Sequence, residues 1–208
     1  MRTVQLLSPF NCGSNLVYKI LSPITNCINA GSTHLWKHAV YKENIEKNVR
    51  RHKNTIFIIM YRPLYSWIKS AQKCSYDLQW DKTLNGPVKI RGRTFKNIIA
   101  LHEFYYNMYA YLHNKYNNVI FLEYYEICKQ DTSYDYLQSK LSKFNVNLTS
   151  PEKYASILNV KSKPHGNPVK NSNDALEKYK RLQLEAPNTL NVNHNIVKFF
   201  ERSTNGLQ

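Results

Sequence analysis

The chain has 208 residues, of which 42% are hydrophobic and 21% are charged. This composition is typical of a folded globular protein and excludes an intrinsically disordered chain. The length suits one domain with a single core. Lys and Arg number 29 against 14 Asp and Glu, which gives a net charge of +15. Such an excess favours an anionic partner (nucleic acid, an anionic membrane surface, or a phosphorylated or sulfated ligand) without choosing among them.

The sequence predicts a cytoplasmic protein without a membrane span, or one in the host cytoplasm if it is viral. Its longest apolar run, residues 56–61, is far below the about 20 residues that cross a bilayer, and the first ten residues are too weakly apolar for a signal peptide. The four cysteines are widely spaced, without a CxxC pair or zinc-like spacing. We therefore expect reduced thiols and no structural metal, with two disulfides as the alternative.

The first part of the chain predicts a strand, a tight turn and a helix. Residues 3–7 form the strand, Gly13 makes the turn, and the helix begins near Ser14 and ends before Pro23. The first N–H groups of a helix have no partner and the helix dipole is positive there, so this turn is a candidate anion site. The alternative is an ordinary strand-to-helix turn of an α/β protein.

A second, nearly continuous apolar run at 55–61 is typical of a central parallel strand. Arg62 follows it directly, and ligands of open parallel sheets bind at the carboxyl ends of the strands. We therefore expect Arg62 and the Gly13 turn to face the same edge. In the helix predicted after Pro63, Ser66 and Ser70 share a face, where a hydroxyl near Arg62 would suit a phosphate; plain exposure is the alternative.

A short strand and loop are predicted at 34–41, and they hold His34, Lys37 and His38. A histidine here would be a proton-transfer group beside the anion site, because histidine titrates near neutral pH. A solvated basic loop is the alternative. A further buried strand is predicted at 119–123.

The other predicted elements complete one domain over residues 1–208, without internal repeats. A basic inserted loop or small hairpin near 74–97 carries Lys89, Arg91, Arg93 and Lys96, and would be a lid or a substrate-binding surface. Helices are predicted at 43–53, 97–116 and 134–144. From about residue 150 the chain is predicted to be irregular, with a surface loop at 161–173, a polar helix at 174–185 capped by Asn173 or Asp174, and a last short helix at 196–202.

The turn and the two strand ends together resemble the P-loop-like sulfotransferase family, which uses 3′-phosphoadenosine 5′-phosphosulfate as donor. PFNCGSNL is similar to the family's 5′-phosphosulfate loop. IFIIMYRPLYSWIKS is similar to its 3′-phosphate motif, where an Arg ends a strand and a Ser follows eight residues later. VIFLEYYEIC resembles the later strand with its RYEDL element, and HLWKH resembles a Trp-Lys-His segment of some bacterial and viral members. The resemblance spans about residues 3–130.

This resemblance implies an α/β fold with a central, mostly parallel sheet flanked by helices, in a P-loop-like nucleotide-binding architecture. The donor would be a co-substrate, without a metal, and the acceptor a hydroxyl or amine. The basic inserted loop hints at an anionic glycan or an acidic peptide. The resemblance assigns the 5′-phosphosulfate to Asn11, Cys12, Gly13, Ser14 and Asn15, and the 3′-phosphate to Arg62 and Ser70. It also implies His38 as general base with His34 as second choice, and Lys37 as the group that stabilises the bridging oxygen.

The sequence departs from the family pattern at several positions. Asn11 stands where the loop is normally basic, so Lys19, Lys37 or a cation of the inserted loop would have to replace that charge. Pro63 follows Arg62 directly, Glu123 stands at the Arg of RYEDL, and the chain is shorter than typical members.

Three other classes of protein compete with the sulfotransferase hypothesis. One is an inactive relative that binds the nucleotide without turnover, and another is a basic nucleic-acid-binding protein whose 16 tyrosines stack on bases. A P-loop kinase or NTPase is disfavoured because GxxxxGK[ST] is absent from the sequence.

Overall fold

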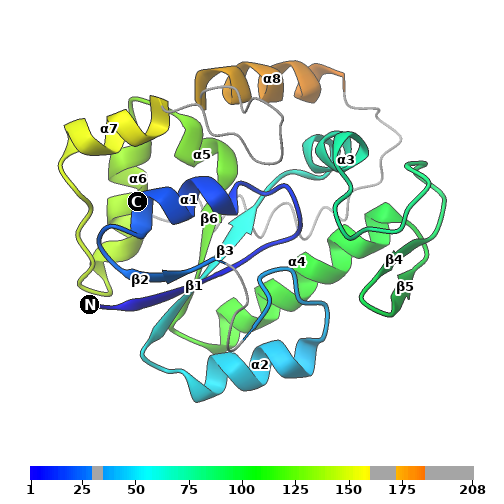
Figure 1. Cartoon of the computed structure of the whole chain (residues 1–208), viewed down its shortest axis with the longest axis horizontal. Coiled ribbons are helices and arrows are strands. Elements are labelled where there is room, and N and C mark those ends of the chain that lie inside the picture. The colour runs from blue at the N-terminus through cyan, green and yellow to red at the C-terminus, as the bar shows by residue number, and fades with distance from the viewer. Residues whose placement is uncertain (30–34, 160–171, 186–208) are drawn as a thin grey trace.

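The computed structural model describes residues 1–29, 35–159 and 172–185, and its centre is a parallel sheet of four strands (Figure 1). The order across the sheet is β2-β1-β3-β6, and every neighbouring pair is parallel. The strands are β1 (Thr3–Leu7), β2 (Asn26–Ile28), β3 (Thr55–Tyr61) and β6 (Val119–Glu123). Helix α1 (Ser14–Leu21) covers one face, and α2 (Lys42–Arg51) and α4 (Ile98–Lys115) cover the other. The predicted α/β fold with a central parallel sheet is confirmed.

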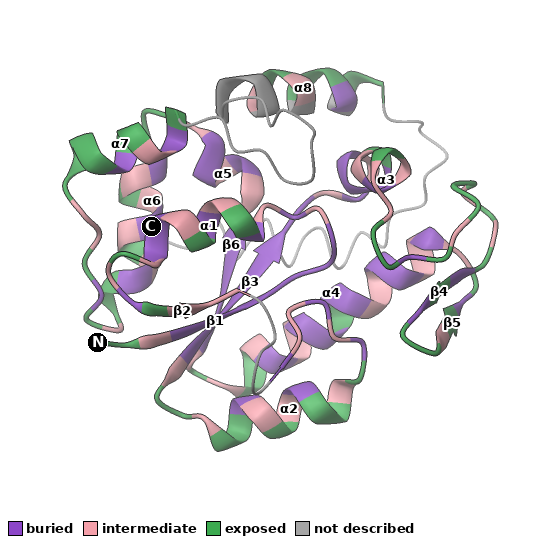
Figure 2. Ribbon diagram, viewed as in Figure 1, coloured by how far each residue is buried: buried purple, intermediate pink, exposed green. Residues whose placement is uncertain are grey.

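Burial explains why these segments pair (Figure 2). Six of the seven β3 residues are buried, as expected for a strand covered on both faces. Helix α1 buries Val17, Ile20 and Leu21, which lie three and four residues apart on one side. Helix α4 packs through a longer stripe that includes Leu101, Tyr105, Tyr109 and Leu112. The core therefore lies on both faces of β1 and β3.

The register brings three chain segments to one edge of the sheet. Leu7 pairs with Ile59, and Tyr61 pairs with Glu123. Since the strands are parallel, the residues after β1, β3 and β6 all leave the sheet at its carboxyl edge, where α/β proteins bind ligands.

The remaining helices surround this sheet: α3 (Leu64–Lys73), α5 (Tyr124–Cys128), α6 (Ser133–Ser142), α7 (Pro151–Asn159) and α8 (Ser172–Leu184). The helices predicted near 43, 97 and 134 correspond to α2, α4 and α6 within two residues. None of the helices in the described ranges is long and apolar enough to cross a membrane.

The hairpin predicted near 74–97 is confirmed. Strands β4 (Val88–Ile90) and β5 (Arg93–Phe95) are antiparallel. Arg91 and Gly92 form the turn with φ of 46° and 80°, which matches the twist of a two-residue hairpin turn. Two hydrogen bonds fasten the hairpin to the segment before α2: Tyr41 Oη donates to the Arg91 carbonyl (2.7 Å) and Arg93 Nη1 donates to the Val40 carbonyl (2.5 Å).

Two sequence predictions about secondary structure are wrong. Residues 35–41 contain a turn at 37–38 and no strand. The strand that pairs with β1 at one edge of the sheet is β2, whose three residues are too few for a periodic signal. The chain after residue 150 is not irregular at first, because α7 begins at Pro151, a favourable first helical residue, and buries Tyr154 and Leu158 four residues apart.

The polar helix begins at Ser172, two residues before the predicted start. Most of the loop predicted at 161–173 and the helix predicted at 196–202 lie outside the described residues. All four cysteines are unpaired.

Candidate functional site

The loop between β1 and α1 is fastened to the protein through its carbonyl groups. Three side chains from distant parts of the chain act as donors. The pairs are His38 Nδ1 to the Ser8 carbonyl at 2.7 Å, Trp67 Nε1 to the Phe10 carbonyl at 2.6 Å, and Arg62 Nη1 to the Asn11 carbonyl at 2.6 Å. These bonds fix the direction of the peptide planes that contain the Ser8, Phe10 and Asn11 carbonyls.

The direction of these carbonyls determines where the N–H groups point. The peptide bonds are trans, so the N–H of Asn11 points away from Trp67 and the N–H of Cys12 points away from Arg62. Hydrogen bonding into α1 begins at Leu16, whose N–H donates to the Gly13 carbonyl at 2.9 Å. The N–H groups of Ser14 and Asn15 precede that bond and belong to the first helical turn, which has no intrahelical acceptors. The loop thus presents N–H groups on the side opposite its anchors.

Two residues of this loop have left-handed backbone conformations. Asn11 has φ 59° and Gly13 has φ 82°. Asn tolerates this region better than a long basic side chain does, and Asn11 Nδ2 donates to the Cys74 carbonyl at 2.8 Å. The asparagine is therefore explained by conformation and anchoring. The Tyr124 ring packs on Gly13 so closely that a Cβ there would collide with it.

Arg62 lies beneath this loop with only 8% of its surface exposed. Its Nε donates to Ser66 Oγ at 2.8 Å, and Ser66 is hydrogen-bonded in turn to the Tyr125 hydroxyl. The Tyr124 and Tyr125 ring centroids lie 5.1 and 5.7 Å from its Cζ. Among the described residues no carboxylate forms an ion pair with Arg62. A buried guanidinium therefore places an unneutralised positive charge at the carboxyl edge of the sheet.

The serine next to Arg62 is Ser66, and the predicted Ser70 lies one helical turn further on, half-buried. The spacing of four residues from Arg62 to Ser66 was the available sequence signal. Tyr124 and Tyr125 were not among the predicted site residues, although both follow β6 directly.

Lys37 lies at the N-terminus of α1. Its Nζ donates to Asn15 Oδ1 at 3.2 Å and to Asn29 Oδ1 at 3.0 Å, and Asn29 Nδ2 donates to Asn15 Oδ1 at 2.8 Å. Burial lowers the pKa of Lys37. The first turn of α1 contains no acidic residue. A cation at the positive end of a helix is unfavourable until an anion joins it, so this arrangement suits an anionic ligand.

Of the replacement cations considered for Asn11, Lys37 is at the loop and Lys19 is not, because Lys19 is in the last turn of α1. Cys12 is fully buried with its Sγ 3.6 Å from the Tyr106 hydroxyl, and burial raises its pKa to about 12. Ser14 is also buried. The cysteine thiol therefore faces the core, and the loop offers a ligand mainly backbone N–H groups.

His38 is buried between two aromatic rings. Its ring stacks on Phe10 with centroids 4.0 Å apart and meets the edge of Trp36 at 5.3 Å. A carbonyl oxygen only accepts hydrogen bonds, so Nδ1 carries the proton that it donates to Ser8. Burial is the main cause that lowers the His38 pKa to about 3. The ring is neutral at pH 7 and a weak base, so its geometry favours a role in holding the loop. His34 lies outside the described residues.

Comparison with protein-family models, curated proteins and solved structures gives no match for this chain. Within the described residues no group of three or more His, Cys, Asp or Glu side chains could hold a metal ion.

We predict that Gly13→Ala costs about 2–4 kcal/mol of unfolding free energy, from a left-handed backbone and a collision with the Tyr124 ring. Gly92→Ala is the matched control, because Gly92 has a similar φ of 80° but only an ordinary contact to Tyr41 Oη at 3.6 Å; it should cost about 1 kcal/mol. Urea unfolding measures both. The packing described would be contradicted if Gly13→Ala and Gly92→Ala lost the same unfolding free energy. It would also be contradicted if Gly13→Ala cost as much in a Tyr124→Ala background as in the wild type.

A second prediction concerns acid stability. Burial holds the pKa of His38 at about 3, against 6.5 unfolded, so the unfolded state binds a proton that the folded state rejects. The stabilisation is complete above pH 6.5 and is lost as pH falls toward 3, at up to about 1.4 kcal/mol per pH unit. His38→Asn keeps a donor for the Ser8 carbonyl and removes the titration, so the stability loss between pH 6 and 4 should become shallower.

Urea unfolding at several pH values tests this second prediction. His102 offers a second test of the same effect, since burial also lowers its pKa, to about 4, and His102→Gln should flatten the same slope additively. An unchanged slope in His38→Asn would show that the histidine is not buried in neutral form.

Proposed function

We propose that this chain is a sulfotransferase that moves a sulfuryl group from 3′-phosphoadenosine 5′-phosphosulfate to a hydroxyl or amine acceptor. The observation that carries the proposal is the uncompensated positive charge around one loop. Lys37 lies at the positive end of α1, whose first turn has no acid, and Arg62 is buried beneath the same loop without a carboxylate partner in the described chain. The resemblance of three motifs in the family's order supports a donor with two anionic groups.

In this proposal two parts of the site bind the two anionic groups of the donor. The N–H groups of Ser14 and Asn15 and the ammonium of Lys37 hold the 5′-phosphosulfate, in a P-loop-like arrangement. The positive charge of Arg62 attracts the 3′-phosphate from beneath the loop, and the hydroxyl of Ser70 is the side-chain group predicted to bind that phosphate. Lys37 takes the place of the basic side chain that the family has at Asn11.

The proposed reaction is a direct transfer to the acceptor. The acceptor oxygen or nitrogen forms a bond to sulfur while the bond between sulfur and the bridging oxygen breaks. The electron pair of that bond stays on the bridging oxygen of the 5′-phosphate, where Lys37 offsets the developing charge. The acceptor proton passes to a base. Because His38 is a buried weak base that holds the loop, it acts as a positioning residue, and His34 is the remaining histidine candidate for proton transfer.

We expect adenosine 3′,5′-bisphosphate to raise the melting temperature, by an amount equivalent to about 2.7 kcal/mol at a concentration of 100 Kd. Lys37→Gln should weaken binding about tenfold or more, because a charge-assisted contact is lost. Lys19→Gln removes the same charge at the opposite end of α1 and should leave the shift intact. Thermal unfolding with and without nucleotide measures this.

Two outcomes would contradict the proposal. One is an equal shift for the wild type and Lys37→Gln. The other is no shift at all together with tight, salt-sensitive DNA binding, which would favour a nucleic-acid-binding protein. Transfer of radiolabelled sulfate into an acceptor then separates an active enzyme from a relative that only binds the nucleotide.

A further inference from the structure

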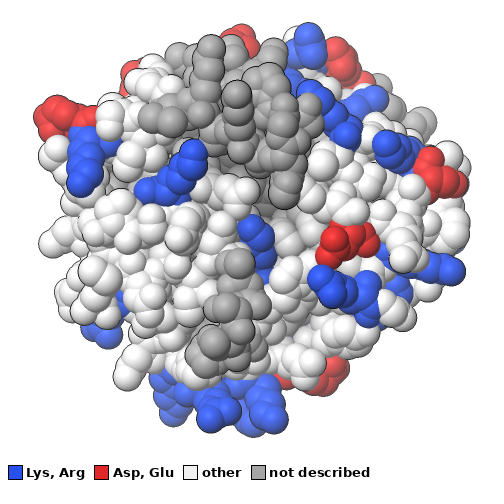
Figure 3. All heavy atoms as spheres, viewed as in Figure 1, with Lys and Arg blue, Asp and Glu red and all other residues white. Residues whose placement is uncertain are grey.

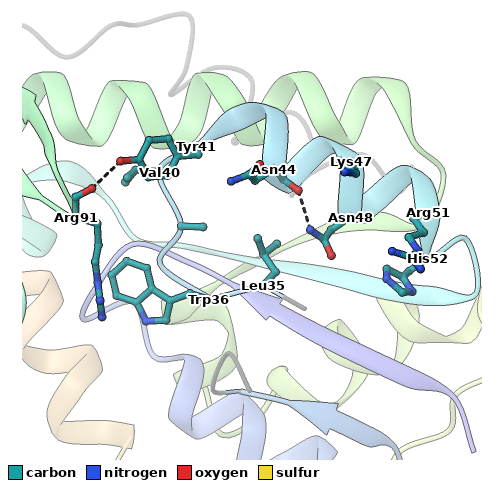
Figure 4. Close-up of a pocket in the computed structure, with 11 residues that line it drawn as sticks. Leu35, Trp36, Val40, Tyr41, Asn44, Lys47, Asn48, Arg51, His52 and Arg91 are labelled. Carbon is teal, nitrogen blue, oxygen red and sulfur yellow. Dashed lines mark hydrogen bonds between the residues drawn. The ribbon is translucent and has the colours of Figure 1, made fainter. Parts of the chain in front are cut away.

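A cleft with a volume of about 750 Å³ lies between α2 and the segment that precedes it (Figure 4). Its lining includes three cations, Lys47, Arg51 and Arg91, together with the amides of Asn44 and Asn48 and the ring of Trp36. No acidic side chain lines the cleft in the described part of the chain. This cleft is thus a second positively charged feature of the protein, separate from the loop after β1.

Helix α2 carries both acidic and basic side chains, and the charged ones that line the cleft, Lys47 and Arg51, are basic. Its Glu46 is turned toward α4, where it accepts hydrogen bonds from Lys115 (2.7 Å), Tyr111 (2.9 Å) and Tyr116 (3.0 Å). Lys47 and Arg51 are four residues apart and so share a face, and no ion pair to either is present in the described residues. Figure 3 shows Lys and Arg gathered along the edge where Figure 1 places α2.

The cleft is elongated. Figure 4 shows Arg91 and Trp36 at one end, Asn44 and Asn48 in the middle, and Arg51 with His52 at the other. It follows α2, whose ten residues correspond to a length of about 15 Å. Cations therefore stand at both ends with amides between them, which suits an extended chain with repeated anionic groups.

One end of the cleft adjoins the loop described above through consecutive residues. Trp36 lines the cleft, whereas the next residue, Lys37, places its ammonium at the N-terminus of α1. The Arg91 guanidinium lies 4.5 Å from the Trp36 ring centroid and forms an exposed ion pair with Asp77 at 3.0 Å. Such an exposed pair contributes little, so Arg91 can exchange it for a ligand anion at low cost.

We propose that this cleft binds an anionic oligosaccharide, and, resting on the proposed function, that this saccharide is the sulfuryl acceptor. Lys47, Arg51 and Arg91 match its carboxylate or sulfate groups, and Asn44 and Asn48 match its hydroxyl groups. Each unit of a sugar chain also carries hydroxyl groups, which are the nucleophiles that the transfer requires. The cleft delivers one end of that chain to the side of Lys37.

Calorimetric titration without nucleotide tests this, with a heparin-derived hexasaccharide as the probe. The double variant Lys47→Gln, Arg51→Gln should bind about tenfold to a hundredfold more weakly, because two charge-assisted contacts are lost. Lys69→Gln with Lys73→Gln is the matched control: it removes the same charge at the same spacing on α3, both side chains being exposed, and should retain the affinity.

Three outcomes would overturn the inference: equal weakening in the control pair, equal binding of a neutral dextran hexasaccharide, or tighter binding of a single-stranded oligonucleotide of the same charge.

The bisphosphate-induced shift of the melting temperature in the Lys47→Gln, Arg51→Gln variant separates the two proposals. If the bisphosphate still raises the melting temperature but the wild type binds no saccharide, the proposed saccharide site is overturned and the proposed donor site is not. Saccharide binding through Lys47 and Arg51 without any bisphosphate shift supports the cleft as a saccharide site and overturns the proposed donor.

Discussion

The bond from the Arg62 guanidinium to the Asn11 carbonyl is the interaction on which the rest of the site depends. It joins the ends of β1 and β3, two neighbouring strands that are 51 residues apart at this contact. By holding that carbonyl toward Arg62 it directs the N–H of Cys12 away from Arg62, and the anchors at Ser8 and Phe10 hold the loop in the same way. A hydrogen bond to a charged group contributes about 1.5–3 kcal/mol, and without it the partly buried carbonyl of Asn11 would lose this partner.

This arrangement gathers positive charge that the described chain does not neutralise locally. Lys37, the N-terminus of α1 and the buried Arg62 repel one another, and a bound anion would reduce this repulsion. The cleft along α2 extends the same property over the neighbouring surface. The net charge of +15 is thus concentrated in at least two places. The β1–α1 loop suits a compact dianionic ligand, and the cleft along α2 suits an extended anionic chain.

The sequence predicted the parts of the fold that have strong local patterns. The apolar run of β3, the three-and-four spacing of α4 and the turn at Gly13 are each visible in a short stretch of sequence. Contacts between distant residues were not visible. His38 was predicted as a base because of its type, but burial lowers its pKa to about 3, and its neutral ring donates to the carbonyl of Ser8, 30 residues away. Asn11 was interpreted as a missing charge, and its left-handed backbone gives a conformational reason for it. Ser66, and not Ser70, contacts Arg62, because the guanidinium folds back along the first turn of α3.

We propose that the N–H groups between the β1–α1 loop and the first turn of α1 bind the donor's anionic groups. The most direct test is to follow backbone amide resonances of ¹⁵N-labelled protein while adenosine 3′,5′-bisphosphate is added. We expect saturable shifts at Cys12, Gly13, Ser14 and Asn15, with the amides of α6 and α7 unchanged. Shifts confined to α2, or none at the loop when ligand is saturating, would contradict it.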